Sequence, residues 1–430
     1  MIISREKYLD LLIKKQWNGM IKVVTGIRRC GKSTLLLKLF RQYLLDSGIP
    51  EKNIISLQLD DDQFMKYRDP AELSKYLRKK IKKNGEKTYI LLDEIQYAIS
   101  KEELRNKDEP IRLYSVLNGL LHMENVDVYV TGSNSKMLSK DISTEFRGRG
   151  DTIQIYPLSF KEFQQASGLH KTDAYDLYKL YGGMPFLLSL DSDEDKYQYL
   201  FNLFEEIYFK DIEERYTVQL PGVLRELTSD LCSSVGSLTN ASKIARTIQS
   251  TKKISVSSET ISTYLNYLTE SFLFSNAERY DIKGKKYFEF PSKYYCTDVG
   301  LRNVRLGLRQ QEETHIMENI IYNELLTRRY SVDVGVVPIP EKNQEGKLER
   351  KNCEIDFIAR KGNVQYYIQS AYRMDSTEKS QTELRPLLAV KDSFKKIVIS
   401  QTSGKSWYDD DGILHMDLID FLLDDDSLDR

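Results

Sequence analysis

Cysteine and histidine are scarce in this chain, and neither is arranged as a metal or redox site. The 430 residues include four cysteines and four histidines, all widely separated. No two cysteines have metal-ligand or redox spacing, which fits a reducing compartment. The cysteines are Cys30, Cys232, Cys296 and Cys353. We therefore expect neither a zinc site nor a disulfide framework.

Long apolar runs and a net charge are also missing. No run approaches the roughly 20 apolar residues that cross a membrane. Lys14, Lys15 and Gln16 interrupt the only apolar stretch near the N-terminus, so we expect no signal peptide. The 63 basic and 64 acidic residues give a net charge of −1, so any patch that binds nucleic acid must be local. We expect a cytoplasmic protein with several domains and no membrane partner.

A phosphate-binding pattern, G-x-x-x-x-G-K-[ST], follows an apolar run at Met20–Val24 and precedes a helical pattern from Leu35. Its glycines allow a tight turn in which backbone N–H groups point at phosphate oxygens, and the helix N-terminus adds a favourable dipole. We expect Lys32 to reach the β- and γ-phosphates and Ser33 to offer its hydroxyl to Mg²⁺. The loop consists of Gly26, Ile27, Arg28, Arg29, Cys30, Gly31, Lys32, Ser33 and Thr34. This motif predicts that the chain binds ATP or ADP.

A second motif, expected of a hydrolase, follows the apolar run Tyr89–Leu92. Such a run predicts a buried parallel strand, and Asp93 falls at its carboxyl end, where α/β sheets hold their ligands. There Asp93 can hold the Mg²⁺ shell, and Glu94 can orient and deprotonate the attacking water. A solvated turn is the alternative explanation.

The first third of the chain alternates strand and helix patterns. This alternation predicts an α/β fold, with a P-loop parallel sheet and helices on both faces. The expected strands cover residues 20–25, 53–59, 88–92 and 126–130, and the expected helices cover residues 4–15, 32–46, 70–83 and 110–122.

Polar and basic residues follow the strand at 126–130. We expect Asn134 to sense the γ-phosphate or position water, although an ordinary Gly-Ser turn explains the pattern equally well. Arg147 and Arg149 stand next to glycines. A guanidinium there could meet the developing phosphate charge, as an arginine finger if a neighbouring subunit supplied it. A basic surface loop is the equal alternative.

These motifs, together with the run Tyr156–Phe163, resemble those of the prokaryotic AAA-type ATPases. More narrowly, they resemble an archaeal and bacterial group with a poorly characterised C-terminal domain. The resemblance implies ATP and Mg²⁺ as cofactors. It also matches Arg149 to the Gly-Arg motif of the family. If Arg149 acted as an arginine finger on a neighbouring subunit, the chain would form a homo-oligomer. The roles argued above carry over to Lys32, Ser33, Asp93 and Glu94.

The resemblance also divides the chain. We expect an ATPase domain at residues 1–165, a helical lid at 166–235, a winged-helix domain at 236–300 and a nuclease-like domain at 301–430. In the lid, Gly182–Pro185 resembles the Gly-x-Pro element of signalling ATPases, which implies that Pro185 packs near the nucleotide base. As plain sequence it is a helix–helix turn.

Residues 236–290 have the pattern of a winged helix, with two short helices, two strands and a hairpin tip at 281–286. Between Thr239 and Tyr287 there are eight basic and four acidic residues, so the segment is locally positive. A positive helix-turn-helix variant favours the phosphates of double-stranded DNA. Winged helices also dock proteins, and that alternative stays open.

The C-terminal part resembles PD-(D/E)XK nucleases. Glu318 and Asp356 match the first two acidic positions, but Gln369-Ser370-Ala371 stands where Glu-x-Lys belongs. A neutral glutamine is a poor Mg²⁺ ligand, so we expect a degenerate domain used for binding or assembly. Glu354 could substitute, which leaves an active nuclease open.

Together these features predict a Mg²⁺-dependent ATPase that works as a switch or motor coupled to DNA. The alternatives are an ATP-gated nuclease or defence effector, and a signalling ATPase with protein partners only. The acidic residues 424–429 are expected to form a frayed, solvated tail.

Overall fold

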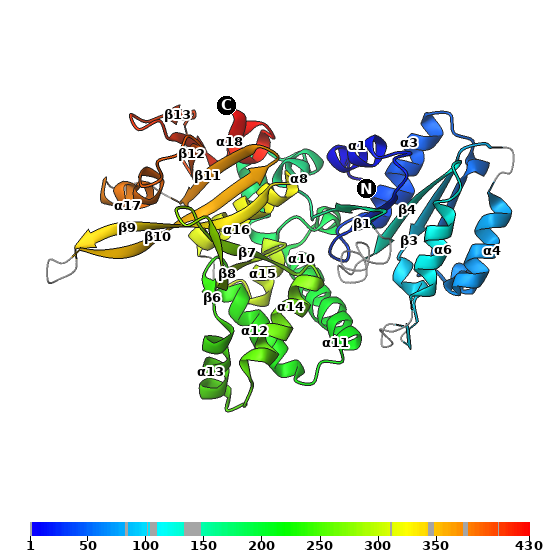
Figure 1. The fold of residues 1–430 in the computed structure, drawn as a ribbon, viewed down its shortest axis with the longest axis horizontal. Helices are drawn as coiled ribbons and strands as arrows, with labels where there is room; N and C mark the ends of the chain where they lie inside the picture. The colour runs from blue at the N-terminus through cyan, green and yellow to red at the C-terminus, as the bar shows by residue number, and fades with distance from the viewer. Residues whose placement is uncertain are drawn as a thin grey trace. The chain divides into compact units, whose positions relative to one another are not determined.

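The computed structural model describes residues 2–81, 85–100, 102–103, 110–132, 148–309, 312–342, 348–372, 377–402 and 404–430 (Figure 1). These residues form two compact units. The first contains the chain up to Pro157 together with Glu270–Phe272, and the second contains Leu158–Thr269 and Leu273–Arg430. Each unit has its own sheet and its own hydrophobic core.

The sheet of the first unit is five-stranded and parallel, which confirms the predicted α/β architecture. Its strands are β1 (Ile21–Thr25), β2 (Ile54–Gln58), β3 (Thr88–Asp93), β4 (Val126–Gly132) and β5 (Gly150–Gln154), in the order β2-β3-β4-β1-β5. Every residue of β1, β3 and β4 is buried, as expected for apolar strands covered on both faces. The carboxyl ends of these three strands therefore share one edge of the sheet.

Helices lie close to the predicted places in this unit. They are α1 (Glu6–Lys14), α2 (Lys32–Thr34), the π-helical turn η1 (Leu35–Phe40), α3 (Arg41–Asp46), α4 (Pro70–Lys80) and α6 (Arg112–Leu120). Asp69 caps α4 by accepting hydrogen bonds from the N–H groups of Ala71 and Glu72, and Pro70 occupies the first helical position. Apolar side chains of α4, α6 and the strands form one buried core.

The second unit begins with a run of helices. They are α8 (Phe160–Ser167), α9 (Lys171–Tyr181), α10 (Asp193–Asn202), the π-helical turn η7 (Leu203–Phe209), α11 (Lys210–Tyr216) and α12 (Pro221–Ser233). After α9 the chain turns at Gly182 and Gly183. The N–H of Gly183 donates a 2.7 Å hydrogen bond to the buried carboxylate of Asp298, and a side chain at Gly182 would collide with that carboxylate. A side chain at Gly183 would collide with the carbonyl oxygen of Leu158, so this turn needs both glycines for a packing reason.

The next elements are β6 (Leu238–Thr239), α13 (Ala241–Lys252), α14 (Ser258–Glu270), β7 (Phe274–Asp281) and β8 (Lys286–Cys296). β8 pairs antiparallel with both β6 and β7, and the β7–β8 hairpin falls on the predicted tip. The element order from α12 onward is thus helix, strand, two helices and a hairpin.

The C-terminal segment extends the same sheet. Its elements are α15 (Val299–Arg305), α16 (Glu313–Thr327), β9 (Ser331–Lys342), β10 (Leu348–Lys361), β11 (Val364–Ala371), α17 (Thr377–Leu388), β12 (Lys395–Ser400), β13 (Trp407–Tyr408), β14 (Leu414–Asp417) and α18 (Leu418–Leu423). β9 pairs in parallel with β7, so nine strands form one sheet in the order β13-β14-β12-β11-β10-β9-β7-β8-β6. The expected boundary at residue 300 therefore does not separate two sheets.

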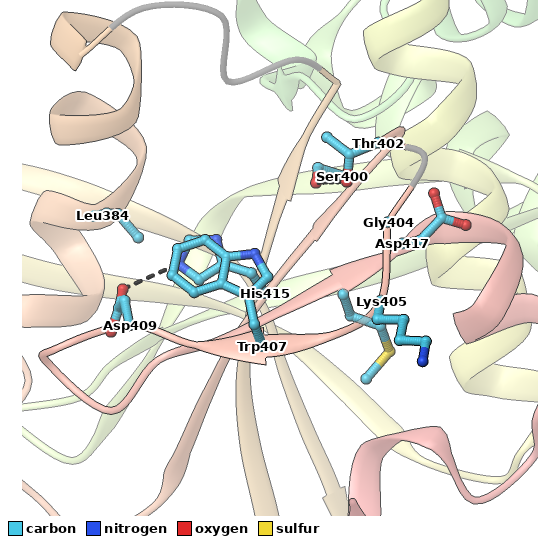
Figure 2. Close-up of a pocket in the computed structure, with 10 residues that line it drawn as sticks. Leu384, Ser400, Thr402, Gly404, Lys405, Trp407, Asp409, His415 and Asp417 are labelled. Atoms are coloured by element: carbon cyan, nitrogen blue, oxygen red, sulfur yellow. Dashed lines mark hydrogen bonds and ion pairs between the residues drawn. The ribbon is translucent and has the colours of Figure 1, made fainter.

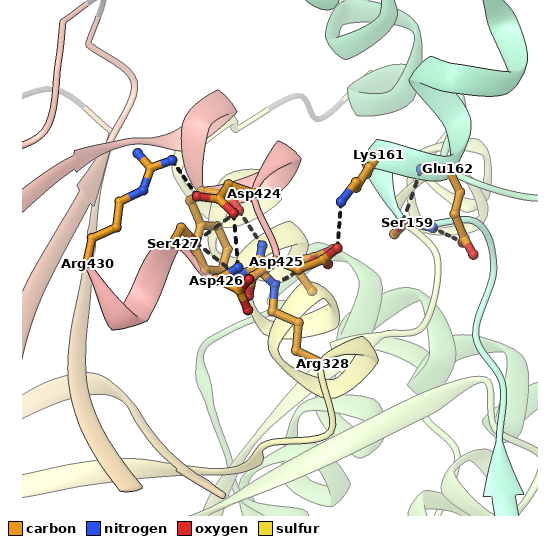
Figure 3. Close-up of polar contacts among 11 residues, drawn as sticks. Ser159, Lys161, Glu162, Arg328, Asp424, Asp425, Asp426, Ser427 and Arg430 are labelled. Carbon is orange, nitrogen blue, oxygen red and sulfur yellow. Dashed lines mark hydrogen bonds and ion pairs between the residues drawn. The ribbon is translucent and has the colours of Figure 1, made fainter. Parts of the chain in front are cut away.

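The acidic C-terminus is docked, which corrects the prediction of a frayed, solvated tail (Figure 3). The Arg328 guanidinium donates to the Asp425 carbonyl at 3.3 Å and to the Ser427 hydroxyl at 2.9 Å. Lys161 pairs with the Asp425 carboxylate at 2.6 Å, and Leu428 is buried. A run of acidic residues favours solvation, but a buried guanidinium and an apolar anchor outweigh that tendency here.

Candidate nucleotide-binding site

The predicted phosphate loop connects β1 to α2 at the carboxyl edge of the first sheet. Gly26 has a φ of 144°, and a side chain there would collide with the carbonyl oxygen of Ile155. Gly31, which directly precedes α2, has a φ of 102°. Only glycine adopts these conformations readily, so the backbone of the loop requires both glycines of the motif.

The Lys32 side chain is buried and folds back onto the loop. Its Nζ donates hydrogen bonds to the carbonyl oxygens of Gly26 at 3.0 Å and Ile27 at 3.1 Å. These main-chain carbonyls thus hold the ammonium beside the backbone N–H groups of the loop, to which phosphate oxygens would bind. This position fits the predicted contact of Lys32 with phosphate oxygens.

The remaining loop residues differ in what they can offer a phosphate. Ile27 and Cys30 are buried, and burial raises the pKa of the Cys30 thiol, which disfavours the reactive thiolate. Their part in binding is limited to the main chain. Arg29 is exposed and has a left-handed φ of 67°, while Arg28 and Thr34 are half-buried. A bulky residue in the left-handed conformation of Arg29 is uncommon and costs conformational energy.

Asp93 ends β3 and is buried at the same edge of the sheet. It accepts a hydrogen bond from the hydroxyl of Thr131, and the hydroxyl of Ser33 lies near enough to lower its pKa. Burial raises the pKa of Asp93, and the two hydroxyl donors partly offset that effect. Carboxylate and hydroxyl oxygens are the ligands that Mg²⁺ prefers, so Asp93 and Ser33 fit the predicted metal site.

Glu94 follows Asp93 in a strained conformation, with a left-handed φ of 52°. Its N–H donates a 3.0 Å hydrogen bond to Thr131 Oγ1, and its carboxylate accepts one from the Gln96 amide. Thr131 therefore contacts both acidic residues. Sequence reasoning gave the role at the end of β4 to Asn134, which lies outside the described residues, and missed Thr131. The position of Thr131 could have revealed its role. It follows Val130, which pairs with Leu92, so Thr131 lies level with Asp93 at the ends of the two strands.

Arg149 lies at the opposite edge of this sheet. It is exposed, directly precedes β5, and its carbonyl oxygen accepts a 2.9 Å hydrogen bond from Ile21 at the start of β1. The phosphate loop begins beyond the other end of β1. A strand of five residues spans about 13 Å between its first and last Cα atoms. Arg149 therefore does not lie beside the phosphate loop of its own chain.

Two other predicted residues are not tested by this geometry. Arg147 lies outside the described residues. Pro185 is the first residue of a short helical turn, η6 (Pro185–Ser189), in the second unit. Its contact with a nucleotide base stays a prediction.

The structure brings together the acidic residues predicted in the nuclease-like part. Asp356 on β10 and Glu318 on α16 both contact the ammonium of Lys293. Gln369 on β11 accepts a 3.4 Å hydrogen bond from the Asp356 N–H and donates its amide to Glu383 at 2.8 Å. Sequence reasoning missed Lys293, because no motif marks a single lysine in a strand.

A pocket of about 440 Å³ lies at the carboxyl ends of β12 and β14 (Figure 2). Trp407 stacks on His415 with 4.3 Å between ring centroids, and Asp409 holds Nε2 of His415 at 3.0 Å. None of the residues predicted from motifs lines this pocket. In the part of the chain that is described, no helix is long and apolar enough to cross a membrane.

Family models match two segments of the chain. One, described as an AAA domain, matches residues 18–164, and another, described as a domain of unknown function (DUF8612), matches residues 172–312. The first match contains the phosphate loop, Asp93, Glu94 and Thr131.

Two known proteins are similar to nearly the whole chain. An "Uncharacterized protein" of Haemophilus influenzae is 36% identical, over 98% of this chain and 99% of the relative. "Uncharacterized protein MJ1544" of Methanocaldococcus jannaschii is 26% identical, over 96% of this chain and 86% of the relative. Among solved structures, the Walker-type ATPase paby2304 of Pyrococcus abyssi is 14% identical with a TM-score of 0.47, over 71% of this chain and 96% of that one.

Proposed function

We propose that this chain, which belongs to one family with the Haemophilus influenzae protein and matches an AAA domain at residues 18–164, hydrolyses ATP in a Mg²⁺-dependent reaction and works as a conformational switch. The phosphate loop, residues 26–34, binds the phosphates. The second unit responds to the state of the nucleotide, as other proteins respond to γ-phosphate contacts.

The proposal rests on one hydrogen-bonded group at the carboxyl edge of the first sheet. Thr131 donates to the Asp93 carboxylate and accepts from the Glu94 N–H, and the Ser33 hydroxyl lies beside the same carboxylate. In this group Ser33 and Asp93 would hold Mg²⁺, which supplies positive charge that stabilises the phosphate oxygens. Glu94 then orients the attacking water and takes its proton. Lys32 adds a second positive charge from the loop.

Arg149 supports the proposal of a homo-oligomer. It is exposed at the amino edge of the sheet, on the side away from the phosphate loop of its own chain. An arginine finger needs a guanidinium at the developing phosphate charge. Arg149 would meet this need in a neighbouring subunit, so the two copies would complete each other's sites.

The coupling to double-stranded DNA is proposed for the winged-helix part. The order α12–β6–α13–α14–β7–β8 supports a winged helix, and exposed basic residues concentrate on α13 and the β7–β8 hairpin. These residues are Lys243, Arg246, Lys252, Lys283, Lys285 and Lys286. They would contact phosphates, so binding should weaken steeply as salt rises.

One observation favours a signalling ATPase with protein partners as the second candidate. In a helix-turn-helix module the second helix enters the DNA groove. Here that helix is α14, which carries two acidic residues, Glu259 and Glu270, and no lysine or arginine. A partner protein could occupy this face without the electrostatic penalty that DNA phosphates would meet.

The C-terminal part is proposed as a nuclease-like domain that no longer cleaves DNA. The order α16–β9–β10–β11–α17–β12 and the proximity of Glu318 to Asp356 support the nuclease-like arrangement. Gln369 at the third position argues against activity. DNA cleavage by the purified protein that disappears in Asp356→Ala would favour the rival ATP-gated nuclease.

Steady-state ATP turnover by the full chain tests the proposal, with and without duplex DNA. We expect Mg²⁺-dependent turnover that DNA raises and that Glu94→Gln abolishes. Turnover that is unchanged by DNA but depends on Glu94 would support the ATPase and favour the alternative with protein partners. Nucleotide binding with no turnover under either condition would contradict the hydrolase.

A further inference from the structure

A buried lysine lies among three carboxylates in the second unit. Lys293 is on β8, and its side chain is only 4% exposed. Its Nζ lies 3.0 Å from Glu318 Oε1, 2.6 Å from Glu354 Oε1 and 3.6 Å from Asp356 Oδ1. The acids come from α16 and β10, so the ammonium joins the hairpin of the proposed winged helix to the proposed nuclease-like part.

Neighbouring groups hold these carboxylates in place. The Tyr295 hydroxyl donates a 2.7 Å hydrogen bond to Glu318, and the Ser370 N–H donates a 2.9 Å hydrogen bond to Asp356. Gln369 donates its amide to Glu383, and as a neutral side chain it adds no charge to the group. These hydrogen bonds hold the carboxylates of Glu318 and Asp356 beside Nζ of Lys293.

The charges of this group favour a bound cation. Burial alone would lower the pKa of Lys293, but the carboxylates of Glu318, Asp356 and Glu354 outweigh burial and raise it. Burial and the nearby Glu318 also raise the pKa of Asp356. One ammonium thus lies among three carboxylates, so the group has an excess of negative charge in a buried place.

A divalent cation does not fit beside this ammonium. Mg²⁺ and Ca²⁺ lie about 2.0–2.6 Å from their oxygen ligands, so a metal bound to these three acids would need the position of Nζ itself. Among the residues that the structure describes, no group of three or more His, Cys, Asp or Glu side chains is arranged to hold a metal ion. The chain supplies its own cation at the place where the nuclease-like arrangement implies a metal.

We propose that Lys293 takes the place of the divalent cation in the nuclease-like part, and that removal of its ammonium opens a site for a hard divalent cation. The inference rests on the proposed nuclease-like arrangement of Glu318 and Asp356. Once the ammonium no longer separates them, Glu318, Glu354 and Asp356 close around the opened site as its ligands, and carboxylate oxygens of this kind suit Mg²⁺ or Mn²⁺. In the natural chain the lysine keeps this centre independent of metal and inactive as a nuclease.

Mn²⁺ binding to the full chain without nucleotide tests the proposal, with free Mn²⁺ followed by electron paramagnetic resonance. We expect Lys293→Met to bind one more Mn²⁺ per chain than the wild type. Lys293→Arg, which keeps the charge, should bind no more than the wild type. Adding Asp356→Asn to Lys293→Met should remove the extra ion. A folded Lys293→Met that binds no extra Mn²⁺ overturns the proposal.

A second measurement covers the case in which Lys293→Met does not fold. Wild type and Asp356→Asn should then give the same Mn²⁺ titration, because the ammonium already fills the site. Mn²⁺ that the wild type binds and Asp356→Asn loses overturns the proposal. ATP turnover of the wild type is measured on the same preparation, so a failed ATPase assay and a failed Mn²⁺ assay point to different units of the chain.

Discussion

The main-chain N–H of Glu94 donates a 3.0 Å hydrogen bond to the hydroxyl oxygen of Thr131, which in turn donates to the Asp93 carboxylate. One hydroxyl therefore fixes the two acidic residues to which we assign the metal and the attacking water. Glu94 has a left-handed backbone conformation, which is unfavourable for a residue with a side chain. The hydrogen bond to this hydroxyl therefore also stabilises the backbone conformation of Glu94.

Replacement of Thr131 by valine keeps the shape of the side chain and removes the hydroxyl. A hydrogen bond to a charged group contributes about 1.5–3 kcal/mol, so we expect ATP turnover to fall roughly 10- to 100-fold. The Kd for ATP, measured by calorimetry, should change little, because the phosphate loop is intact. Thr131→Ser restores the hydroxyl and should restore turnover. Equal turnover in the valine and serine variants would show that the hydroxyl has no part in catalysis.

A methyl group at Gly26 would collide with the carbonyl oxygen of Ile155. We expect Gly26→Ala to lower the free energy of unfolding by about 1–3 kcal/mol, the usual cost of a strained backbone position, and to abolish ATP binding. Gly19→Ala is the matched control, since Gly19 also has a positive φ of 74° but open space around it. Urea unfolding and nucleotide titration separate the two variants. Normal ATP binding by Gly26→Ala would contradict the role of this close approach.

Arg149 should act on the nucleotide of a neighbouring subunit. We expect Arg149→Ala to lower turnover roughly 10³-fold, the lower end of the effect of an arginine finger, with ATP binding retained. A mixture of Arg149→Ala and Glu94→Gln, each inactive alone, should regain turnover, because some sites then combine an intact Glu94 with an intact Arg149. No regain in a mixture shown to co-assemble would place Arg149 outside the reaction.

Asp298 should make stability depend on pH. Burial raises its pKa to about 6, although it accepts hydrogen bonds from Gly183 and Leu301. An unfolded aspartate releases its proton near pH 4, so between about pH 4 and pH 6 the folded state binds the extra proton and stability falls as pH rises. The expected loss is on the order of 3 kcal/mol. Urea unfolding at several pH values should show this component in the wild type and not in Asp298→Asn. The same pH slope in both would contradict it.

Local patterns predicted the first unit well. The strands of the parallel sheet are continuous apolar runs, and the glycines of the loop belong to a motif whose reason is local backbone geometry. The carboxylates Asp93 and Glu94 were predicted as site residues because they directly follow such a run. The position of a residue at the end of a buried strand can therefore be predicted from the sequence.

Contacts between distant segments were not predictable in this way. Thr131 meets Asp93 because β4 pairs with β3 in one register, and Arg149 is set away from the phosphate loop by the pairing of β5 with β1. Lys293 meets its carboxylates only through the packing of β8, α16 and β10. The acidic residues 424–429 were predicted to be solvated because their composition does not indicate that Arg328, about 100 residues earlier in the chain, binds this segment.

The nucleotide that remains bound after one turnover tests the central claim most directly. Stoichiometric ATP with Mg²⁺ is incubated with the full chain, and the bound nucleotide is recovered and identified by chromatography. We expect ADP from the wild type and unreacted ATP from Glu94→Gln, because that substitution keeps the phosphate loop and removes the base. Unreacted ATP from the wild type, or ADP in equal yield from both proteins, would contradict hydrolysis by the Asp93–Glu94 site.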